Sequence, residues 1–343
     1  MDATVYREEI ELRHAVRASG ERHATRARLY VSLRHEGSEG FGEVSPQPHA
    51  LHGDPGEAQV RSAIERALAR VREVTLREGD VPHWARASRL GDGRGSDNVA
   101  YALIEMALLD RDLRRHVTSI RDLWGPVNDT PVQSTVSVLD DEPWEIDERA
   151  ARVRVKCAPG SLGGRAIQRL VELNLPVLLD FNCSATNDAE VLELLDAVSR
   201  VANVEAIEQP YAVGNVVDHA QLARQLAVPL SLDEGVRSLR DLHQIVRYRA
   251  AQMICVKPAR VGGLANARTL IGRAEGLGLR AYLGGFFESP YARAVHRALA
   301  DSCVREPSDL GEVVVRHPRP AALVNASFGR EPSLEGLPVV FEM

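Results

Sequence analysis

Lysine is nearly absent from this 343-residue chain, and the two lysines that occur are the first candidates for chemistry. Of the 42 lysine and arginine residues, only Lys156 and Lys257 are lysines. A compositional bias can replace lysine with arginine wherever a solvated charge is enough, but it does not explain the two lysines that remain. A guanidinium stays protonated, whereas a buried ammonium can lose its proton and act as a base. We therefore predict that both lysines are catalytic.

Three acidic residues lie between the two lysines and share their spacing. Asp180, Glu208 and Asp233 follow Lys156 at intervals of about 25 residues, and Lys257 comes one interval later. Each of the five ends a short apolar run. Because the carboxyl ends of the strands of a βα barrel meet at one mouth, we expect the five side chains to converge there. Three converging carboxylates repel one another unless a cation joins them, and all-oxygen ligands favour Mg²⁺, or Mn²⁺, over zinc.

This set of residues is suited to removing the proton α to a substrate carboxylate. The metal would bind the carboxylate and stabilise the enediolate that forms when the proton leaves. One lysine would take the proton, with its pKa lowered by burial and by neighbouring cations such as Arg154. The other lysine would either protonate the opposite face, which gives racemisation, or stay an ammonium over the enediolate, which allows elimination.

Short apolar runs alternate with helical segments from Thr130 onward, as in consecutive βα units. An open doubly wound sheet is the alternative, but no G-x-G-x-x-G follows the first strand. The expected fold class is therefore α/β, with a TIM-like (β/α)7β barrel. The expected strands are "TPVQSTVSV", "RVRVKC", "PVLLDFN", "VEAIEQP", "VPLSLDEG", "AQMICVKP" and "LRAYLGG", with "LGEVVV" (310–315) as an eighth. The expected helices are 163–173, 188–201, 216–226, 237–248 and 264–278.

The first third of the chain has a different pattern, that of an α+β domain. Residues 1–48 alternate as in an antiparallel meander, and helices are expected at 57–77 and 96–115. The tail "LEGLPVVFEM" predicts one more strand of this domain. We expect an α+β domain over 1–125, the barrel over 126–321 and a returning segment over 322–343.

Composition limits the classes of partner. The net charge of −6, with 26% charged and 44% hydrophobic residues, gives no reason to expect nucleic acid or a membrane surface. No run of 18 apolar residues occurs, and the N-terminus lacks a signal-peptide core, so we expect a cytoplasmic protein. The four cysteines show no metal-binding spacing, and we expect them to be reduced.

The motifs that carry the five residues resemble those of a known family. The chain is similar to the enolase superfamily, in the muconate-lactonizing-enzyme subgroup, and most of all to the branch of o-succinylbenzoate synthase and N-acylamino-acid racemase. "RVKCAPG" resembles the K-x-K element of that branch, "LDFN" its D-x-N, "IEQP" its E-Q-P, "SLDEG" its L-D-E-S and "VKPARVGG" its K-P-G-R-V-G-G. "YLGGFFES" followed by "RAVHRALA" resembles its seventh-strand region, and "GFGEVSP" the G-W-G-E element of its N-terminal capping domain.

The resemblance implies a role for each matched residue. Lys156 and Lys257 are the implied acid–base pair, and a lysine base with Mg²⁺ is known chemistry of this superfamily. The implied metal ligands are Asp180, Glu208 and Asp233. Implied substrate-binding or supporting residues are Arg154, Asn182, Glu234, Gly284 and Gly285, although Asn182 can equally form a turn and the glycines a tight turn. The substrate is a small carboxylate, and a homo-oligomer is expected because enzymes of this kind often assemble.

Two reactions remain open, because both need the same five residues. The first is syn-dehydration, as in o-succinylbenzoate synthase, and the second is racemisation of an N-acylamino acid. A dipeptide epimerase, a cycloisomerase or a specialised natural-product pathway enzyme would use the same site. From other classes, a Schiff-base lysine enzyme leaves the three carboxylates without a role, and a non-catalytic binding barrel leaves the lysines without one.

The chain also departs from the family pattern. Arg154 stands where the first lysine of K-x-K is expected. Phe181 and Cys183 stand where small or polar residues are expected, and Phe286 and Phe287 add bulk near the seventh strand. No role is assigned to His49 and His52 in "SPQPHALHGD", or to Asp309 and Glu312 in "SDLGEVV".

Overall fold

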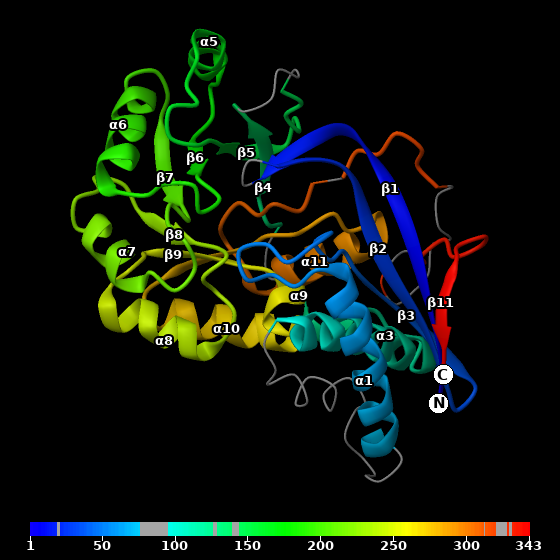
Figure 1. Ribbon diagram of the computed structural model, residues 1–343. Coiled ribbons are helices and arrows are strands. Elements are labelled where there is room, and N and C mark those ends of the chain that lie inside the picture. Colours follow the sequence, from blue (N-terminus) through cyan, green and yellow to red (C-terminus); the bar gives the residue numbers. More distant parts are fainter. Residues whose placement is uncertain are drawn as a thin grey trace.

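A computed structural model of the chain describes two sheets with their helices. The described residues are 1–18, 21–75, 95–125, 129–138, 144–311, 313–319, 328 and 331–343. Figure 1 shows a long antiparallel hairpin beside a curled parallel sheet, with the marked N- and C-termini close together at the far end of the hairpin.

The N-terminal sheet is antiparallel, as the alternating residues predict. Its strand order is β11-β1-β2-β3. The last strand pairs with β1, so the end of the chain returns to the sheet that the beginning of the chain forms, and the predicted tail strand is confirmed. The strands are β1 (Asp2–Ala18), β2 (Glu21–His35), β3 (Ser38–Val44) and β11 (Val339–Glu342).

Two long helices, α1 (Glu57–Thr75) and α3 (Ser96–Arg115), pack with this sheet, and both were predicted. Apolar residues of α1 recur every three or four positions and therefore share one face. Those that predicted the helix are all buried: Val60, Ile64, Leu68 and Val71.

Helix α3 is buried on nearly all sides because it lies between two cores. Leu103 packs in the core of the antiparallel sheet, while Met106 and Leu109 pack in the core of the parallel sheet. The backbone of β3 approaches α3 at two glycines. A Cβ atom added to Gly42 would lie 2.0 Å from the carbonyl oxygen of Leu103, and one added to Gly40 would lie 2.2 Å from that of Ala107.

The second sheet contains seven parallel strands, and all seven predicted strands are confirmed. Its order, β10-β9-β8-β7-β6-β5-β4, follows the sequence without a switch point, as in a βα barrel and unlike a doubly wound sheet. The strands are β4 (Val132–Ser137), β5 (Ala150–Lys156), β6 (Val177–Asp180), β7 (Val204–Glu208), β8 (Leu230–Leu232), β9 (Met253–Val256) and β10 (Arg280–Leu283).

The five predicted helices of this part are also confirmed. They lie on the outer side of the curled sheet (Figure 1) and bury one face each. They are α5 (Gly164–Glu172), α6 (Asp188–Ser199), α7 (Val216–Ala223), α8 (Leu239–Tyr248) and α10 (Leu264–Gly276). Three further helices are α4 (Ile120–Trp124), α9 (Pro258–Val261) and α11 (Pro290–Cys303).

The prediction that the eighth strand lies at 310–315 is wrong. The segment around Ser308, not 310–315, hydrogen-bonds to both edges of the seven-stranded sheet. Ser308 exchanges backbone hydrogen bonds of 2.9 Å with the chain at Pro131 and Gln133, and Asp309 N donates to Leu283 O at 2.9 Å. Val315 instead forms a bridge with Leu12 of β1. The apolar run after Ser308 belongs to the other sheet, which the sequence pattern alone does not distinguish.

Arg28 of β2 joins the antiparallel sheet to the loop after β10. Its Nε donates to the carbonyl oxygen of Phe287 at 2.7 Å and its Nη2 to that of Glu288 at 3.2 Å. Glu43 of β3 accepts a hydrogen bond of 2.6 Å from Ser289 N. The antiparallel sheet therefore holds the loop that carries the predicted glycines of the site.

The proposed domain boundaries stay a prediction, because 126–128 and 320–327, where they fall, lie outside the described residues. None of the helices that the structure describes combines the length and the apolar character that crossing a membrane requires.

Substituting Gly42 tests the contact between β3 and α3. We expect Gly42→Ala to lower the free energy of unfolding by about 1–3 kcal/mol, because the methyl group would overpack a backbone contact. Gly272→Ala is the control, since Gly272 lies exposed on α10 with open space at its Cβ position. Alanine favours a helix over glycine by up to about 1 kcal/mol, so this variant should be unchanged or more stable. Equal losses in thermal denaturation would contradict the close contact.

Candidate active site

The residues predicted to act together do meet at the carboxyl ends of the parallel strands. In the sheet register, Lys156 of β5 stands beside Asp180 of β6, and Asp180 stands beside Glu208 of β7. Asp233 follows β8 directly and Lys257 follows β9 directly. Lys257 Nζ donates to Asp233 Oδ2 at 2.8 Å. The spacing of the sequence therefore becomes a row of charged groups across five neighbouring strands.

The three carboxylates of this row have no exposed surface. Asp180, Glu208 and Asp233 are each 0% exposed. Glu208 accepts hydrogen bonds from Arg154 Nη1 at 3.1 Å and from the hydroxyl of Tyr282. Burial, together with the negative charges of Asp180 and Asp233, nevertheless raises the pKa of Glu208 to about 8. Without a further cation, the ionised form of Glu208 is therefore disfavoured.

Asp233, unlike Glu208, lies beside cations that lower its pKa. Burial alone would raise its pKa, but the Arg260 guanidinium and the Lys257 ammonium together hold the pKa of Asp233 well below its usual range. Arg260 Nη1 lies 2.5 Å from Asp233 Oδ1 and also donates to the backbone oxygen at 2.9 Å. Asp233 is therefore ionised in the folded protein.

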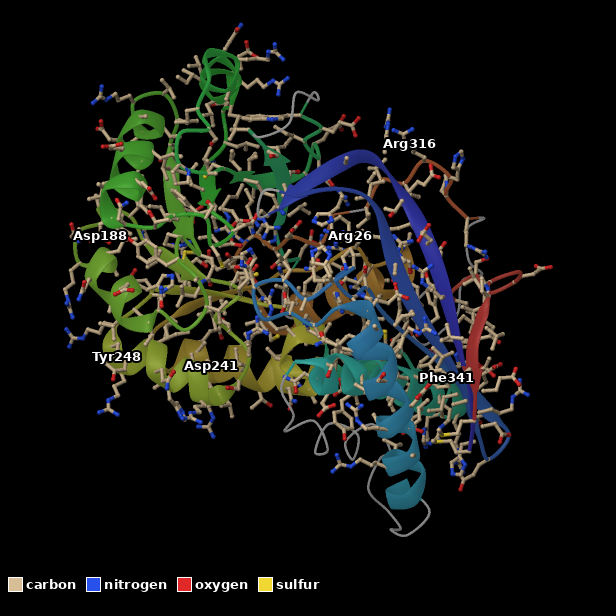
Figure 2. All side chains as sticks on the ribbon, in the orientation of Figure 1. Arg26, Asp188, Asp241, Tyr248, Arg316 and Phe341 are labelled. Atoms are coloured by element: carbon tan, nitrogen blue, oxygen red, sulfur yellow. The ribbon has the colours of Figure 1, made fainter. Side chains whose placement is uncertain are left out.

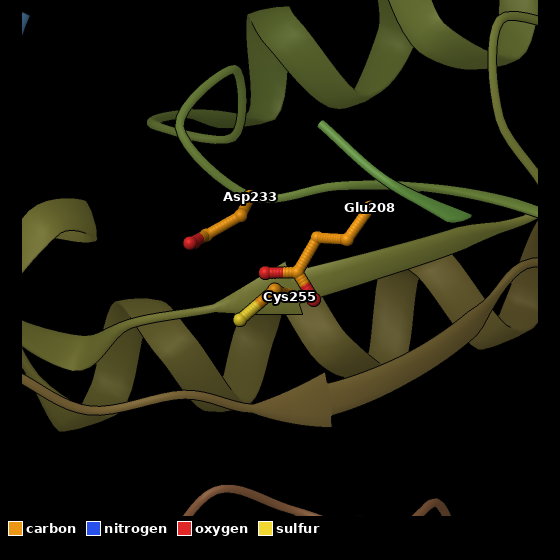
Figure 3. Close-up of side chains that lie close together, drawn as sticks. All are labelled: Glu208, Asp233 and Cys255. Atoms are coloured by element: carbon orange, nitrogen blue, oxygen red, sulfur yellow. The ribbon is translucent and has the colours of Figure 1, made fainter. Parts of the chain in front are cut away.

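The donor atoms fit a hard divalent metal ion. Within the described ranges, oxygens of Glu208 and Asp233 and the sulfur of Cys255 all lie within 4.8 Å of one another (Figure 3). Burial raises the pKa of the Cys255 thiol well above its usual range, so the thiol is protonated and a poor ligand. Carboxylate oxygens are the ligands that Mg²⁺ prefers.

The predicted third ligand, Asp180, lies outside that cluster. Its two oxygens accept hydrogen bonds from Asn182, at 2.9 Å from the backbone N–H and at 3.0 Å from the side-chain amide. Arg154 Nε lies 3.9 Å from Asp180 Oδ2. A guanidinium thus stands beside the carboxylates that a metal would bind, and ligation by Asp180 stays a prediction.

The two lysines differ in their surroundings. Burial, with the positive charges of Arg154 and Lys257, lowers the pKa of Lys156, and Asp180 only partly opposes this. Within the part of the chain that the structure describes, Lys156 Nζ makes no hydrogen bond or ion pair. For Lys257, burial is outweighed by Asp233, which raises the pKa of the ammonium. Lys257 Nζ also lies 4.7 Å from the ring centroid of Phe286, over its face.

Arg154 takes the position expected of a lysine and donates hydrogen bonds to three side chains. Besides Glu208, it reaches Asp309 Oδ2 at 2.5 Å and Thr135 Oγ1 at 3.2 Å. This ion pair gives Asp309, for which the sequence offered no role, a place in the site. Glu312 lies outside the described residues.

Asn182 and Glu234 extend the row of acidic groups into the cavity. Asn182 Nδ2 lies 3.4 Å from Glu234 Oε1, and the other oxygen of Glu234 has no hydrogen-bond partner among the described residues. Burial, with Asp233 and Asp180 nearby, raises the pKa of Glu234 to about 7. Asn182 has a φ of 43°, so its backbone does form a turn while its amide binds Asp180.

The two glycines are required by close side chains, not by a turn, since neither has a positive φ. A Cβ atom at Gly284 would lie 2.5 Å from Cys255 Sγ and 3.0 Å from Lys257 Cε. A Cβ atom at Gly285 would lie 2.6 Å from Arg293 Nη1. Gly284 therefore leaves room for the stem of a predicted catalytic lysine.

Sequence reasoning missed Arg260 and Asp54. Arg260 donates to the Asp54 carboxylate at 2.9 and 2.7 Å while it binds Asp233, so it ties the loop after β3 to the site. Arg237 Nη2 lies 3.3 Å from the same carboxylate. The motif "VKPARVGG" could have pointed to Arg260, because this arginine stands one helical turn after Lys257.

The two histidines of the loop after β3, His49 and His52, differ in their exposure. His52 is half-buried and lines the cavity, and burial lowers its pKa. His49 is exposed, with its ring 6.1 Å from that of His23. The cavity has a volume of about 590 Å³. Its wall combines charged groups of the site with apolar side chains from both sheets and their loops, among them Leu12, Val136, Trp144 and Phe287.

Comparisons with known proteins identify relatives of this chain. A family model described as Enolase C-terminal domain-like matches residues 164–332. Chloromuconate cycloisomerase of Cupriavidus pinatubonensis is 37% identical over 294 residues, which cover 80% of this chain and 76% of that protein. N-succinylamino acid racemase of an Amycolatopsis species is 29% identical over 277 residues, 76% of this chain and 72% of that protein.

Two further matches agree with these. The o-succinylbenzoate synthase of Enterococcus faecalis is 28% identical over 283 residues, 79% of this chain and 75% of that protein. The structure of a probable mandelate racemase from Alicyclobacillus acidocaldarius superimposes with a TM-score of 0.75 at 26% identity, over 90% of this chain and 84% of that one.

Metal binding can be tested without a substrate. At about 100 times its Kd, Mg²⁺ should stabilise the protein by about 2.7 kcal/mol, measured as a rise in Tm. We expect Asp180→Asn to abolish that rise, because it removes a carboxylate ligand, and Cys255→Ala to keep it, because the ion does not need the thiol. The metal-free variants, compared by circular dichroism, control for folding. A rise that Asp180→Asn keeps and Cys255→Ala loses would contradict the predicted ligands.

Proposed function

Because this chain belongs to the enolase superfamily, in its muconate-lactonizing-enzyme subgroup, we propose that it removes the proton α to the carboxylate of a small substrate, with Lys156 as the base. The observation that carries the proposal is the asymmetry of the two lysines. Lys156 Nζ has no partner in the described residues and lines the cavity, whereas Lys257 Nζ is bound to Asp233. Membership in this superfamily argues against the Schiff-base and non-catalytic alternatives.

Asp180, Glu208 and Asp233 would hold Mg²⁺ beside the cavity that Lys156 and Lys257 line. The bound ion supplies Lewis-acid stabilisation of the negative charge that develops on the substrate carboxylate as the proton leaves. The chain itself supplies the rest of the electrostatics. Arg154 and Lys257 hold fixed positive charges around the same point, and Phe286 shields Lys257 on one side. These charges favour a neutral Lys156 that can accept the proton.

The fate of the proton separates the two leading reactions. In a syn-dehydration of the o-succinylbenzoate-synthase type, Lys156 Nζ takes the proton and returns it to the departing hydroxyl on the same face, while Lys257 stays an ammonium. The hydrogen bond of Lys257 to Asp233 favours this one-base reaction, because Lys257 is held as a charge.

Racemisation of an N-succinylamino acid is the second candidate. Here Lys257 would give its proton to the face opposite Lys156. It is favoured by the position of the two lysines on either side of the carboxylates and by the N-succinylamino acid racemase among the relatives.

Proton exchange in D2O tests the role of the lysines. With Mg²⁺ and a panel of N-succinylamino acids, dipeptides and small carboxylic acids, we expect NMR to detect exchange of the α-proton in the wild type. Lys156→Ala should slow exchange by about 10²–10⁴-fold, the usual contribution of a general base. An EDTA-treated sample controls for the metal. Exchange of both enantiomers at the wild-type rate in Lys156→Ala would contradict the proposed base.

Lys257→Arg separates the two reactions. The guanidinium keeps the positive charge beside Asp233 but does not exchange protons at neutral pH. If the reaction is a dehydration, this variant should keep part of the wild-type rate. If it is a racemisation, exchange should remain for one enantiomer and disappear for the other.

A further inference from the structure

Tyr282 of β10 reaches across the inside of the parallel sheet to a predicted metal ligand. Its side chain is fully buried, and its hydroxyl donates a hydrogen bond to Glu208 Oε2. In the sheet, β9 and β8 lie between β10 and β7, so the two residues are not neighbours along it. The tyrosine side chain therefore crosses the interior of the curled sheet. Figure 2 shows side chains crowding that interior, as expected of a barrel that is packed and not open.

Ser231 of β8 lies behind the tyrosine hydroxyl. Ser231 Oγ is 2.9 Å from the hydroxyl oxygen of Tyr282, and this serine is also fully buried. In the sheet register Ser231 stands directly beside Glu208. Within the described residues, however, its side chain hydrogen-bonds to the tyrosine and not to the carboxylate. The hydroxyl of Tyr282 thus links the two strands across the interior.

The direction of these hydrogen bonds follows from the charge of a metal-binding carboxylate. A carboxylate that binds a metal ion is deprotonated, so it can only accept. Tyr282 must then donate to Glu208, and because a hydroxyl has a single proton, Ser231 must donate to Tyr282. Arg154 Nη1 donates to the other oxygen of Glu208, Oε1, at 3.1 Å. Each oxygen of Glu208 is therefore held by one donor and keeps a second lone pair for an ion.

Glu208 depends on a neutral hydroxyl more than the two aspartates do. Asp233 is held by two cations, and both oxygens of Asp180 accept hydrogen bonds from Asn182. Glu208 is hydrogen-bonded to one cation, Arg154. A glutamate side chain also has one more rotatable bond than an aspartate, so fixing it costs more conformational entropy. The second donor is therefore most useful at Glu208.

The ring of Tyr282 is itself fixed in place. The guanidinium carbon of the buried Arg152 lies 5.0 Å from the centroid of the ring, and Arg152 Nε donates to Gln133 Oε1 at 2.6 Å. The ring also packs in the core of the parallel sheet. A phenylalanine would fill the same space, so packing alone does not require the hydroxyl. Its contact with Glu208 accounts for it.

We propose that Tyr282 is a positioning residue of the metal site, which holds Glu208 in the orientation that binds a hard divalent ion, and that Ser231 acts through it. This inference rests on the proposed function for the role of Glu208 as a ligand, but it concerns metal binding and not proton transfer. Residues that hydrogen-bond to metal ligands contribute about 10–100-fold to metal affinity. The hydroxyl should therefore affect the ion before any substrate is present.

Calorimetric titration of the metal-free protein with Mg²⁺ tests this role without a substrate. Tyr282→Phe should raise the Kd for Mg²⁺ by about 10–100-fold, because it removes only the hydroxyl. Ser231→Ala should raise it less, since Tyr282 can still donate to Glu208. The double variant Tyr282→Phe/Ser231→Ala should bind Mg²⁺ as Tyr282→Phe does, because two residues that act through one contact are not additive.

Tyr291→Phe is the matched control. Tyr291 is also a buried tyrosine, and its hydroxyl donates to the backbone oxygen of Phe41, outside the site. This variant should keep the wild-type Kd for Mg²⁺. The Tm values of the metal-free variants, measured in EDTA, report on folding. Tyr282→Phe and Tyr291→Phe should shift the Tm by similar amounts, since each loses one buried hydrogen bond.

The outcomes separate this inference from the proposed function. An unchanged Kd in Tyr282→Phe overturns the positioning role. An equal loss of affinity in Tyr291→Phe overturns it too, because the effect would then be one of folding. A double variant that binds Mg²⁺ more weakly than Tyr282→Phe overturns the part assigned to Ser231.

Proton exchange in the wild type completes the comparison. Mg²⁺ affinity that depends on Tyr282, in a wild type that exchanges no α-proton, supports the inference and refutes the proposed function. Mg²⁺-dependent exchange in the wild type, with a Kd that Tyr282→Phe leaves unchanged, does the reverse.

Discussion

Three carboxylates are held out of water at the ends of neighbouring parallel strands, and most other features of the site follow from their charge. Hydrogen bonding between β6 and β7 sets Asp180 beside Glu208, and β8 delivers Asp233 next to them. Carboxylates buried together are costly unless cations or hydrogen bonds compensate them. Arg154, Lys257 and Arg260 supply part of that compensation. The need for further positive charge beside the carboxylates is the physical reason to expect a divalent metal ion.

The antiparallel sheet completes the site because it carries residues that the barrel lacks. Arg28 holds the loop after β10, and Asp54 orients Arg260 against Asp233. The same sheet contributes Arg26 and apolar side chains to the cavity wall. Under the proposed function the strand ends provide the proton chemistry, and the antiparallel sheet forms part of the cavity wall that a substrate would contact. The relatives include a racemase, a synthase and a cycloisomerase.

The difference between the lysines arises from their neighbours, not from their type. Both are lysine amines near the same carboxylates, Lys257 buried and Lys156 half-buried. Asp233 holds Lys257 by a direct hydrogen bond, whereas Asp180, which stands beside Lys156, directs its two oxygens to Asn182. Which amine gives up its proton more easily is therefore decided by where each carboxylate points.

The sequence by itself determined the order of the parallel strands, the helices between them and the five charged residues at their ends. Those follow from local periodicity, since each βα unit ends its strand at the same mouth, and the rarity of lysine marked two of them. The closing segment at Ser308 was misplaced because an apolar run does not reveal which sheet it joins.

Only the tertiary structure decided the contacts of Arg260, Asp54 and Arg26. Their partners come from the other sheet or from distant loops, and an arginine in a chain with so many carries no signal of its own. Whether a buried charge is paired depends on the packing of the two sheets against each other, which no local pattern records.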